Sequence, residues 1–306
     1  MKLAFLILAH KLPAQLDALI RLLQGPDVGI FLHVDAKSTA IDSGHLARWS
    51  ALPGVTVLDK PESVSWGSFA QIRATWRLLE TAHARGPYDR YLLVSGQDLP
   101  LMPPDAMRAF FLQHPDAQFM ECFALPAPTR WNGEGGMDRV ELLWLDPPLE
   151  PLNRPLHAAQ RTFGFRRRLD GGPFFGGANW FNLNAPCVAW LIAWTQANPQ
   201  FWRMFQHTRC ADEMVVQTLV MRSPFASTCV AETLRHINWE DGPEFPRTLR
   251  SVDLPRILAD QRALFARKFD PAVDAEVGRV VVNAAWRRYG VTPEATAQSL
   301  ERGTTS

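Results

Sequence analysis

Basic side chains near the C-terminal end of this sequence form a pattern that can bind a diphosphate. Arg247 lies in F-P-R-T-L, and the pair Arg267-Lys268 lies in L-F-A-R-K-F-D. Fixed cations can stabilise the negative charge of a diphosphate without a metal ion. The acidic positions upstream contain no D-x-D pair of the kind that binds a divalent metal. The sequence therefore predicts an anion site that uses neither a metal nor a cofactor.

Two adjacent acids, Asp212 and Glu213, precede an apolar helical pattern that begins near Val215. Adjacent residues of a helix project about 100° apart, so both carboxylates cannot address one target. We expect Asp212 to be the N-cap of this helix, which leaves Glu213 free to face a cleft. The alternative is that both acids only complement the positive end of the helix dipole.

Two of the 11 tryptophans lie beside polar groups and glycine turns. Trp239 is in I-N-W-E-D-G, and Trp180 follows Asn179 in G-G-A-N-W-F. An aromatic face next to acids and amides suits a ring that has both C–H patches and hydroxyl groups. Buried tryptophan is ordinary core material, so we expect only Trp239, Trp180 and Asn179 to contact such a ligand.

Short apolar runs alternate with helical patterns along the first hundred residues. We expect buried strands at 3–8, 30–34, 55–58 and 90–94. Helical patterns follow Pro13 and Ser68. This alternation predicts an α/β fold with a mostly parallel, doubly wound sheet. Ligands bind beyond the carboxyl ends of such strands, which places Asp35 and Asp98 at the expected site.

The composition is that of an ordinary globular protein and excludes several classes of function. The 306 residues are 47% hydrophobic, enough for one large or two moderate domains. Lys and Arg total 32 against 31 Asp and Glu, so the net charge is only +1. Proteins that bind nucleic acid usually carry a basic footprint, and we therefore expect no nucleic-acid partner.

The sequence also bears on the compartment. The apolar run after Lys2 is too short for a signal peptide, and no run reaches the ~20 residues of a membrane span. The four cysteines lack C-x-x-C spacing, which predicts buried free thiols in a reducing environment. We expect a cytoplasmic protein, and peripheral contact with the inner membrane is left open.

Residues 124–175 are rich in Pro, Gly and Arg and have weak periodicity. A long irregular stretch inside a domain is usually functional or mobile. It includes the basic cluster Arg166-Arg167-Arg168, which we interpret as a solvated turn without an assigned role.

Seven motifs, in this order along the chain, resemble one known family. They are F-L-H-V-D-A-K, S-V-S-W-G-S, Y-L-L-V-S-G-Q-D-L-P, G-G-A-N-W-F-N-L, A-D-E, L-R-H-I-N-W and L-F-A-R-K-F-D. Each motif alone is weak, but together they are similar to the core-2/I-branching β-1,6-N-acetylglucosaminyltransferases and the peptide O-xylosyltransferases, including their bacterial members. The resemblance spans most of the chain, to about Gly290.

This resemblance implies a GT-A type glycosyltransferase domain over residues 1–290 and a tail over 291–306. It implies a nucleotide-binding half at about 1–123 and an acceptor and catalytic half at about 124–290. The implied reaction is a metal-independent, inverting transfer of N-acetylglucosamine or xylose from a UDP-sugar to a hydroxyl group, which forms a β-linkage. The acceptor would be a glycan, a lipid-linked saccharide or a peptide hydroxyl.

The resemblance also implies roles for individual residues. Asp35 would contact uridine, Glu213 would be the catalytic base and Trp239 would line the acceptor site. The diphosphate would be held by Arg247 together with Arg267 or Lys268.

Two positions depart from the patterns of related enzymes. Asp98 would occupy the region where metal-dependent GT-A enzymes have their D-x-D motif, and here it stands alone. Asn179 replaces the acid of the xylosyltransferase motif G-G-S-D-W-F, so the second candidate base of that subgroup is missing.

Two other functional classes were weighed. A dinucleotide-binding dehydrogenase would need G-x-G-x-x-G after its first strand, where this chain has A-H-K-L-P. A non-catalytic carbohydrate-binding protein on the same fold remains the alternative, and it would bind sugars without releasing UDP. The sequence leaves both the donor sugar and the acceptor open.

Overall fold

A computed structural model of the chain describes residues 1–167, 172–240 and 245–293. The residues group into two compact units that are interleaved along the sequence. The first unit comprises Met1–Pro61, Ala84–Pro115 and the chain from Leu234 onward. The second unit comprises Glu62–His83 and Asp116–Thr233. The functional halves that the resemblance implies, divided near residue 123, stay a prediction.

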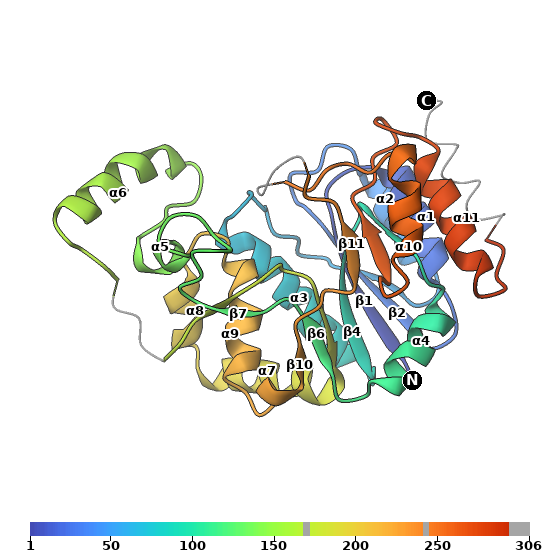
Figure 1. Ribbon diagram of the computed structural model, residues 1–306, viewed down its shortest axis with the longest axis horizontal. Helices are drawn as coiled ribbons and strands as arrows, with labels where there is room; N and C mark the ends of the chain where they lie inside the picture. Colours follow the sequence, from blue (N-terminus) through green and yellow to red (C-terminus); the bar gives the residue numbers. More distant parts are fainter. Residues whose placement is uncertain (168–171, 241–244, 294–306) are drawn as a thin grey trace. The chain divides into compact units, whose positions relative to one another are not determined.

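The first unit contains a parallel sheet with the strand order β4-β1-β2-β3 (Figure 1). Its strands are β1 (Leu3–Ala9), β2 (Val28–Val34), β3 (Val55–Val57) and β4 (Arg90–Ser95). The side chains of β1 from Leu3 to Ile7 are fully buried, as expected for a strand covered on both faces. The α/β fold and the parallel strands predicted from the sequence are confirmed.

Two helices connect these strands and bring polar residues to one edge of the sheet. Helix α1 (Pro13–Leu23) begins with a proline, which lacks the N–H that a helix start leaves unpaired. Helix α2 (Ser43–Ser50) is capped by the Asp42 carboxylate, which accepts a hydrogen bond from the His45 amide at 2.9 Å. Since β1 and β2 end at Ala9 and Val34, His10 and Asp35 lie at the carboxyl edge.

The rest of the first unit packs around a second, three-stranded sheet. Its strands are β5 (Asp98–Pro100), β11 (Arg235–Ile237) and β12 (Phe265–Arg267), in the order β11-β12-β5. Its other helices are α4 (Pro104–Gln113), α10 (Leu254–Ala259) and α11 (Val277–Arg287). Leu99 of β5, Ile257 of α10 and Val281 of α11 share one buried apolar cluster, which anchors the C-terminal segment to this unit.

The second unit is built from short elements. Its strands are β6 (Gln118–Met120), β7 (Phe123–Ala124), β8 (Phe175–Gly176), β9 (Phe181–Asn184) and β10 (Cys229–Val230). Its helices are α3 (Phe69–Arg85), which runs to the boundary of the unit, α5 (Met137–Glu141), α6 (Asn153–Thr162), α7 (Ala185–Ala197), α8 (Gln200–Phe205) and α9 (Val215–Met221).

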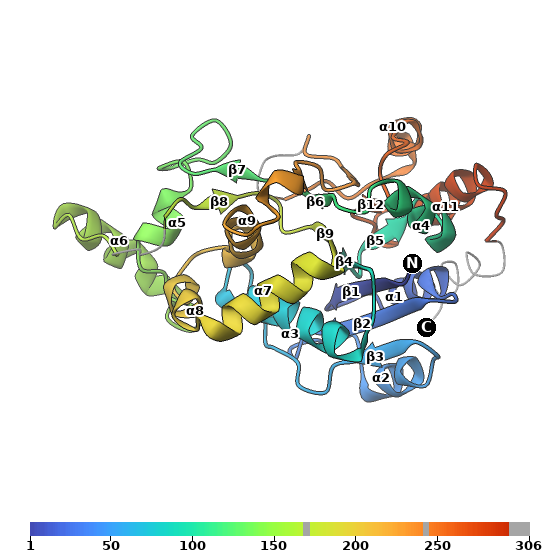
Figure 2. The ribbon, with the colours of Figure 1, turned by 90° about the horizontal axis from the view of Figure 1, so that it is seen from below.

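Within the second unit, α9 packs against β8 (Figure 2). The hydroxyl of Thr218 on α9 accepts a hydrogen bond from the Phe175 amide at 3.1 Å and donates one to the Phe175 carbonyl at 3.2 Å. This contact fixes the helix that follows the two acids against the strand that leads into G-G-A-N-W-F.

The structure corrects two expectations for residues 124–175. The segment is not irregular throughout, because it contains α5 and α6. Arg167 is also not solvated: its guanidinium donates hydrogen bonds to the carbonyls of Val140, Met204 and His207. Arg166 pairs with Glu134, and Arg168 lies outside the described residues.

The state of the cysteines and the length of the helices bear on the expected compartment. All four cysteines are free; Cys187 and Cys210 are buried, whereas Cys122 and Cys229 are half-buried. None of the helices in the described ranges is both long and apolar enough to span a bilayer.

Candidate functional site

The two adjacent acids lie in the second unit, in a 3-10 turn that precedes α9. This turn spans Ala211–Glu213, and the Glu213 amide donates to the Cys210 carbonyl at 3.0 Å. Helix α9 begins only at Val215, and its N-cap is Met214. The prediction that Asp212 caps this helix is therefore wrong. The chain tightens into a separate turn, and both carboxylates belong to that turn rather than to the helix.

Glu213 is held by an arginine that the sequence analysis did not identify. The Arg139 Nη1 donates to Glu213 Oε2 at 2.6 Å, and the two side chains are 23% and 34% exposed. The expectation that Glu213 faces a cleft stays a prediction. Burial raises the pKa of the Glu213 carboxyl above its ordinary value, and the Arg139 charge and hydrogen bond oppose that rise.

The pKa of Asp212 is also raised. Burial first, and then the neighbouring Glu213 charge, raise the pKa of Asp212 to about 7. A hydrogen bond from the Asn179 side chain and the more distant Arg139 charge act in the opposite direction. The pKa values of both neighbouring acids are therefore raised by burial, and Arg139 opposes the rise at each of them. We call Asp212, Glu213 and Arg139 the carboxylate site.

The loop that carries Asn179 is tied to the carboxylate site by its backbone. The Gly177 amide donates to the Glu213 carbonyl at 3.0 Å. The Ala178 amide donates to Glu121 Oε2 at 2.9 Å, and the Ala178 carbonyl accepts from Gln217 of α9 at 2.8 Å. These three contacts hold the glycine turn against the A-D-E turn, α9 and the segment after β6.

Trp180 and Trp239 have different surroundings. Trp180 is only 8% exposed and belongs to the core of the second unit. Trp239 is 48% exposed and lies in the first unit after β11. Their assignment to an acceptor site stays a prediction.

The first unit gathers cations around Lys268, directly after β12. The Lys268 carbonyl accepts from the Leu249 amide at 2.9 Å, which places the chain at Arg250 beside it. Lys11 Nζ pairs with Asp270 Oδ2 at 2.9 Å. Burial, Arg267 and Lys11 lower the pKa of Lys268, and Asp270 raises it. We call Lys11, Arg250 and Lys268 the cation site.

Arg267 and Asp98 form a buried cluster beneath this surface. Asp98 is fully buried; its Oδ1 lies 3.6 Å from Arg267 Nε and its Oδ2 lies 3.5 Å from Arg235 Nε. One carboxylate therefore faces two guanidinium groups, and the cluster retains a net positive charge. In this structure Asp98 is an internal counter-ion of arginines.

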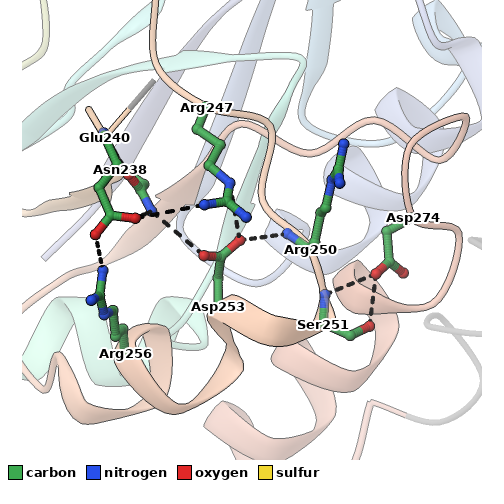
Figure 3. Close-up of polar contacts among 8 residues, drawn as sticks. All are labelled: Asn238, Glu240, Arg247, Arg250, Ser251, Asp253, Arg256 and Asp274. Carbon is green, nitrogen blue, oxygen red and sulfur yellow. Dashed lines mark hydrogen bonds and ion pairs between the residues drawn. The ribbon is translucent and has the colours of Figure 1, made fainter. Parts of the chain in front are cut away.

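Arg247 is engaged by carboxylates, whereas Arg250 is exposed (Figure 3). Arg247 Nη1 lies 3.6 Å from Glu240 Oε2, and its Nε lies 3.9 Å from Asp253 Oδ2. Among the residues that the structure describes, the Arg250 guanidinium makes no ion pair, and the Arg250 amide donates to Asp253 at 2.8 Å. The sequence analysis missed Arg250, although it lies only three residues after Arg247.

Asp35 lies at the carboxyl edge of the parallel sheet, as expected. Its amide donates to the Ala9 carbonyl at 2.8 Å, and its carboxylate accepts from the Lys37 amide at 2.8 Å. His10 lies beside it at the end of β1. Burial and Lys11 lower the pKa of His10, and Asp35 raises it.

The structure thus brings the predicted residues together in two groups. Glu213, Asp212 and Asn179 meet in the second unit. Asp98 and Arg267 meet in the first unit, next to Lys268. Arg139 is the ion-pair partner that the structure adds to Glu213, and Arg250 is an exposed cation whose backbone neighbour Leu249 bonds to Lys268.

Comparison with known proteins supports the resemblance found in the motifs. Human xylosyltransferase 1 is 24% identical over 298 residues, covering 90% of this chain and 29% of the human protein. The xylosyltransferase of Ciona intestinalis is 20% identical over 317 residues, covering 96% of this chain and 35% of that protein. This chain therefore spans about a third of the length of the curated relatives it matches.

One solved structure is also similar. Mouse xyloside xylosyltransferase 1 in its apo form aligns over 88% of this chain and 94% of its own, with 12% identity and a TM-score of 0.34. The sequence model described as "Branch: Core-2/I-Branching enzyme" matches residues 3–261. The family predicted from the seven motifs is thereby confirmed, and this chain belongs to the Core-2/I-Branching enzyme family.

Proposed function

We propose that the protein is a glycosyltransferase that moves a sugar from a UDP-sugar to an acceptor hydroxyl with inversion at the anomeric carbon. The observation that carries this proposal is the state of Glu213. Its carboxylate is partly exposed, it is paired with Arg139 at 2.6 Å, and its neighbour Asp212 takes up a proton near neutrality. A partly exposed carboxylate beside a fixed arginine is placed to accept a proton, because the Arg139 charge favours its ionised form.

In the proposed reaction Glu213 removes the proton from the acceptor hydroxyl. The acceptor oxygen then attacks the anomeric carbon from the face opposite UDP. The bond from that carbon to the diphosphate oxygen breaks, and UDP leaves with the bonding electron pair. A well-placed general base contributes roughly 10²- to 10⁴-fold to such a rate.

The cation site of the first unit supports the diphosphate half of the proposal. Lys268 and Arg250 would bind the leaving diphosphate, whose negative charge increases as the bond breaks. Cations fixed in advance stabilise that transition state more than the ground state. The buried Arg267 adds positive charge beneath them. These fixed charges support the proposal that transfer needs no divalent metal.

Arg247 has a different role in this proposal. Glu240 and Asp253 hold its guanidinium, and its amide donates to the Asn238 carbonyl at 2.8 Å. These contacts tie the segment after β11 to the start of α10 (Figure 3). We infer that Arg247 shapes the segment that presents Arg250, and that Asp35 contacts the uridine from the edge of the parallel sheet.

The family and the curated relatives point to N-acetylglucosamine or xylose as the donor sugar. Asn179 bonds to Asp212 and stands where the xylosyltransferase motif has an acid. Proton removal therefore falls to Glu213 alone.

The decisive experiment measures UDP release with UDP-N-acetylglucosamine, UDP-xylose and other UDP-sugars, with and without mixed glycan and peptide acceptors. The wild-type protein should release UDP in an acceptor-dependent manner in the presence of a chelator. Glu213→Gln should lose at least 10²-fold in turnover. Sugar binding without UDP release from any donor would instead identify a carbohydrate-binding protein. Activity that chelation removes and manganese restores would exclude the metal-independent mechanism.

A further inference from the structure

We propose that Arg139 is a positioning residue that fixes the orientation of the Glu213 carboxylate and favours its ionised form. We also propose that Trp131, seated between two glycines, holds Arg139 in place. This inference rests on the proposed role of Glu213 as the base. All of the residues concerned lie within the second unit.

The contact between Arg139 and Glu213 joins residues that are 74 positions apart in the sequence. Arg139 lies on α5, and its carbonyl accepts from the Arg209 amide at 3.1 Å. That backbone bond fixes α5 next to the segment that leads into the turn carrying Glu213. The backbone of Arg139 therefore contacts the segment before the turn, and its side chain contacts Glu213 in the turn.

An aromatic platform supports the Arg139 guanidinium. Its central carbon lies 3.8 Å from the centre of the Trp131 ring. A guanidinium over an indole face is attracted by the ring and loses freedom to rotate away. The Phe123 ring meets Trp131 edge-on at 5.1 Å and fixes the indole in turn. Phe123 thus supports Trp131, Trp131 supports Arg139, and Arg139 holds Glu213.

Two glycines make room for this platform. A Cβ at Gly176 would lie 2.4 Å from an indole carbon of Trp131, and a Cβ at Gly136 would lie 2.3 Å from another. Gly136 also has φ of 92°, a conformation that other residues rarely adopt. Gly136 of W-N-G-E-G-G and Gly176 of F-F-G-G therefore share one physical cause, which is the position of the Trp131 ring.

The charges around Glu213 show what Arg139 opposes. Glu121, from the segment after β6, raises the pKa of Glu213, and the Glu213 charge raises the pKa of Asp212 on the same turn. The nearby Cys210 thiol is neutral, because burial raises its pKa to about 12. Arg139 supplies the charge that favours the ionised form of Glu213. Without Arg139, burial and the neighbouring acid Glu121 would both still raise the pKa of Glu213.

The test compares Arg139→Gln and Arg139→Lys with the wild type. The carboxyl ¹³C signal of Glu213 is followed by NMR against pH, so this readout does not depend on knowing the substrate. An adjacent opposite charge shifts a carboxyl pKa by about 1 to 3 units, so the Glu213 midpoint should rise by that amount in Arg139→Gln. It should stay near the wild-type midpoint in Arg139→Lys, which keeps the charge.

Arg77→Gln is the matched control, because Arg77 pairs with Glu62 at 2.8 Å elsewhere in the second unit. It should leave the Glu213 midpoint unchanged. An unchanged midpoint in Arg139→Gln, with the fold intact by circular dichroism, would overturn the inference. Equal shifts in Arg139→Gln and Arg77→Gln would also overturn it, since the effect would then not be specific to Arg139.

Turnover separates this inference from the proposed function. The acid limb of the kcat/KM profile should move to higher pH in Arg139→Gln. In Arg139→Lys the limb should stay at the wild-type pH, but kcat should fall because lysine lacks the planar guanidinium group. If Glu213→Gln is inactive but the limb does not move in Arg139→Gln, the proposed function stands and Arg139 is not a positioning residue. If Glu213→Gln stays active while the NMR midpoint moves, Arg139 holds Glu213 but Glu213 is not the base.

Discussion

Replacing Asp212 with asparagine removes a carboxyl group whose pKa the folded chain raises from 3.8 to about 7. Asparagine keeps the size of the side chain and an oxygen that can accept from Asn179. The substitution therefore isolates the cost of ionising this buried group beside Glu213. Between pH 4 and 7 the native state binds this proton more tightly than the unfolded chain. The contribution of Asp212 to the stability of the wild type must therefore fall as the pH rises through that window.

The size of the effect follows from the shift. Roughly 3 pKa units correspond to about 4 kcal/mol at 1.36 kcal/mol per unit. This figure is an upper limit, because the titration of Asp212 depends on the charge of Glu213 and because Asp212 retains some access to water. We expect Asp212→Asn to match the wild type at pH 4 and to exceed its stability by about 2 to 4 kcal/mol at pH 8.

Urea unfolding at pH 4, 6 and 8 measures this difference for both proteins. The wild-type curve should shift to lower urea with rising pH by more than the Asp212→Asn curve does. A free-energy difference that is independent of pH would refute the reasoning, because a raised pKa requires this linkage. A wild type that gains stability over the variant with rising pH would show that Asp212 is stabilised as the anion.

Two further predictions concern the supports of the sites. Gly176→Ala should destabilise the fold by about 1 to 3 kcal/mol in urea unfolding, because the new methyl group meets the Trp131 ring, whereas Gly25→Ala has no close neighbour and should be near neutral. Arg250→Gln should weaken UDP binding about tenfold in calorimetry, or about 1.4 kcal/mol, while Arg247→Gln should mainly lower stability through the loss of its contacts with Glu240 and Asp253. A larger loss of UDP affinity in Arg247→Gln than in Arg250→Gln would reverse these assignments.

The parallel sheet could be predicted because its signal is local. Each of β1, β2 and β4 is a short apolar run, and Pro13 marks the start of the first helix. The position of Asp35 at the sheet edge then follows from topology alone.

Helix α6 escaped prediction because it buries polar side chains. Its buried residues are Asn153, His157 and Gln160. The Asn153 side chain bonds to both backbone groups of Leu145, and the His157 ring lies 3.0 Å from the Leu143 carbonyl. These side chains satisfy a neighbouring loop backbone, so the usual apolar stripe of a helix is replaced by a polar one. Reading the hydrophobic period cannot detect such a helix.

The carboxylate site shows a different limit. The pair Asp212-Glu213 before an apolar run matches the pattern of a capped helix, but Cys210 has φ of 52° and the chain forms a separate 3-10 turn. The Arg139 partner lies 74 residues away, and nothing in the local sequence links the two positions. The acidic pair could therefore be identified as a candidate site from the sequence, whereas the ionic partner of Glu213 required the tertiary structure.

In the proposed mechanism, cations bind the diphosphate and Glu213 removes the proton, so the two functions reside in different residues. The most direct test measures UDP affinity and acceptor-dependent turnover on the same preparation of Glu213→Gln, with chelator present. We predict that UDP binds with the wild-type dissociation constant while turnover falls by at least 10²-fold. Undiminished turnover in this variant would contradict the account, and so would a comparable loss of UDP affinity.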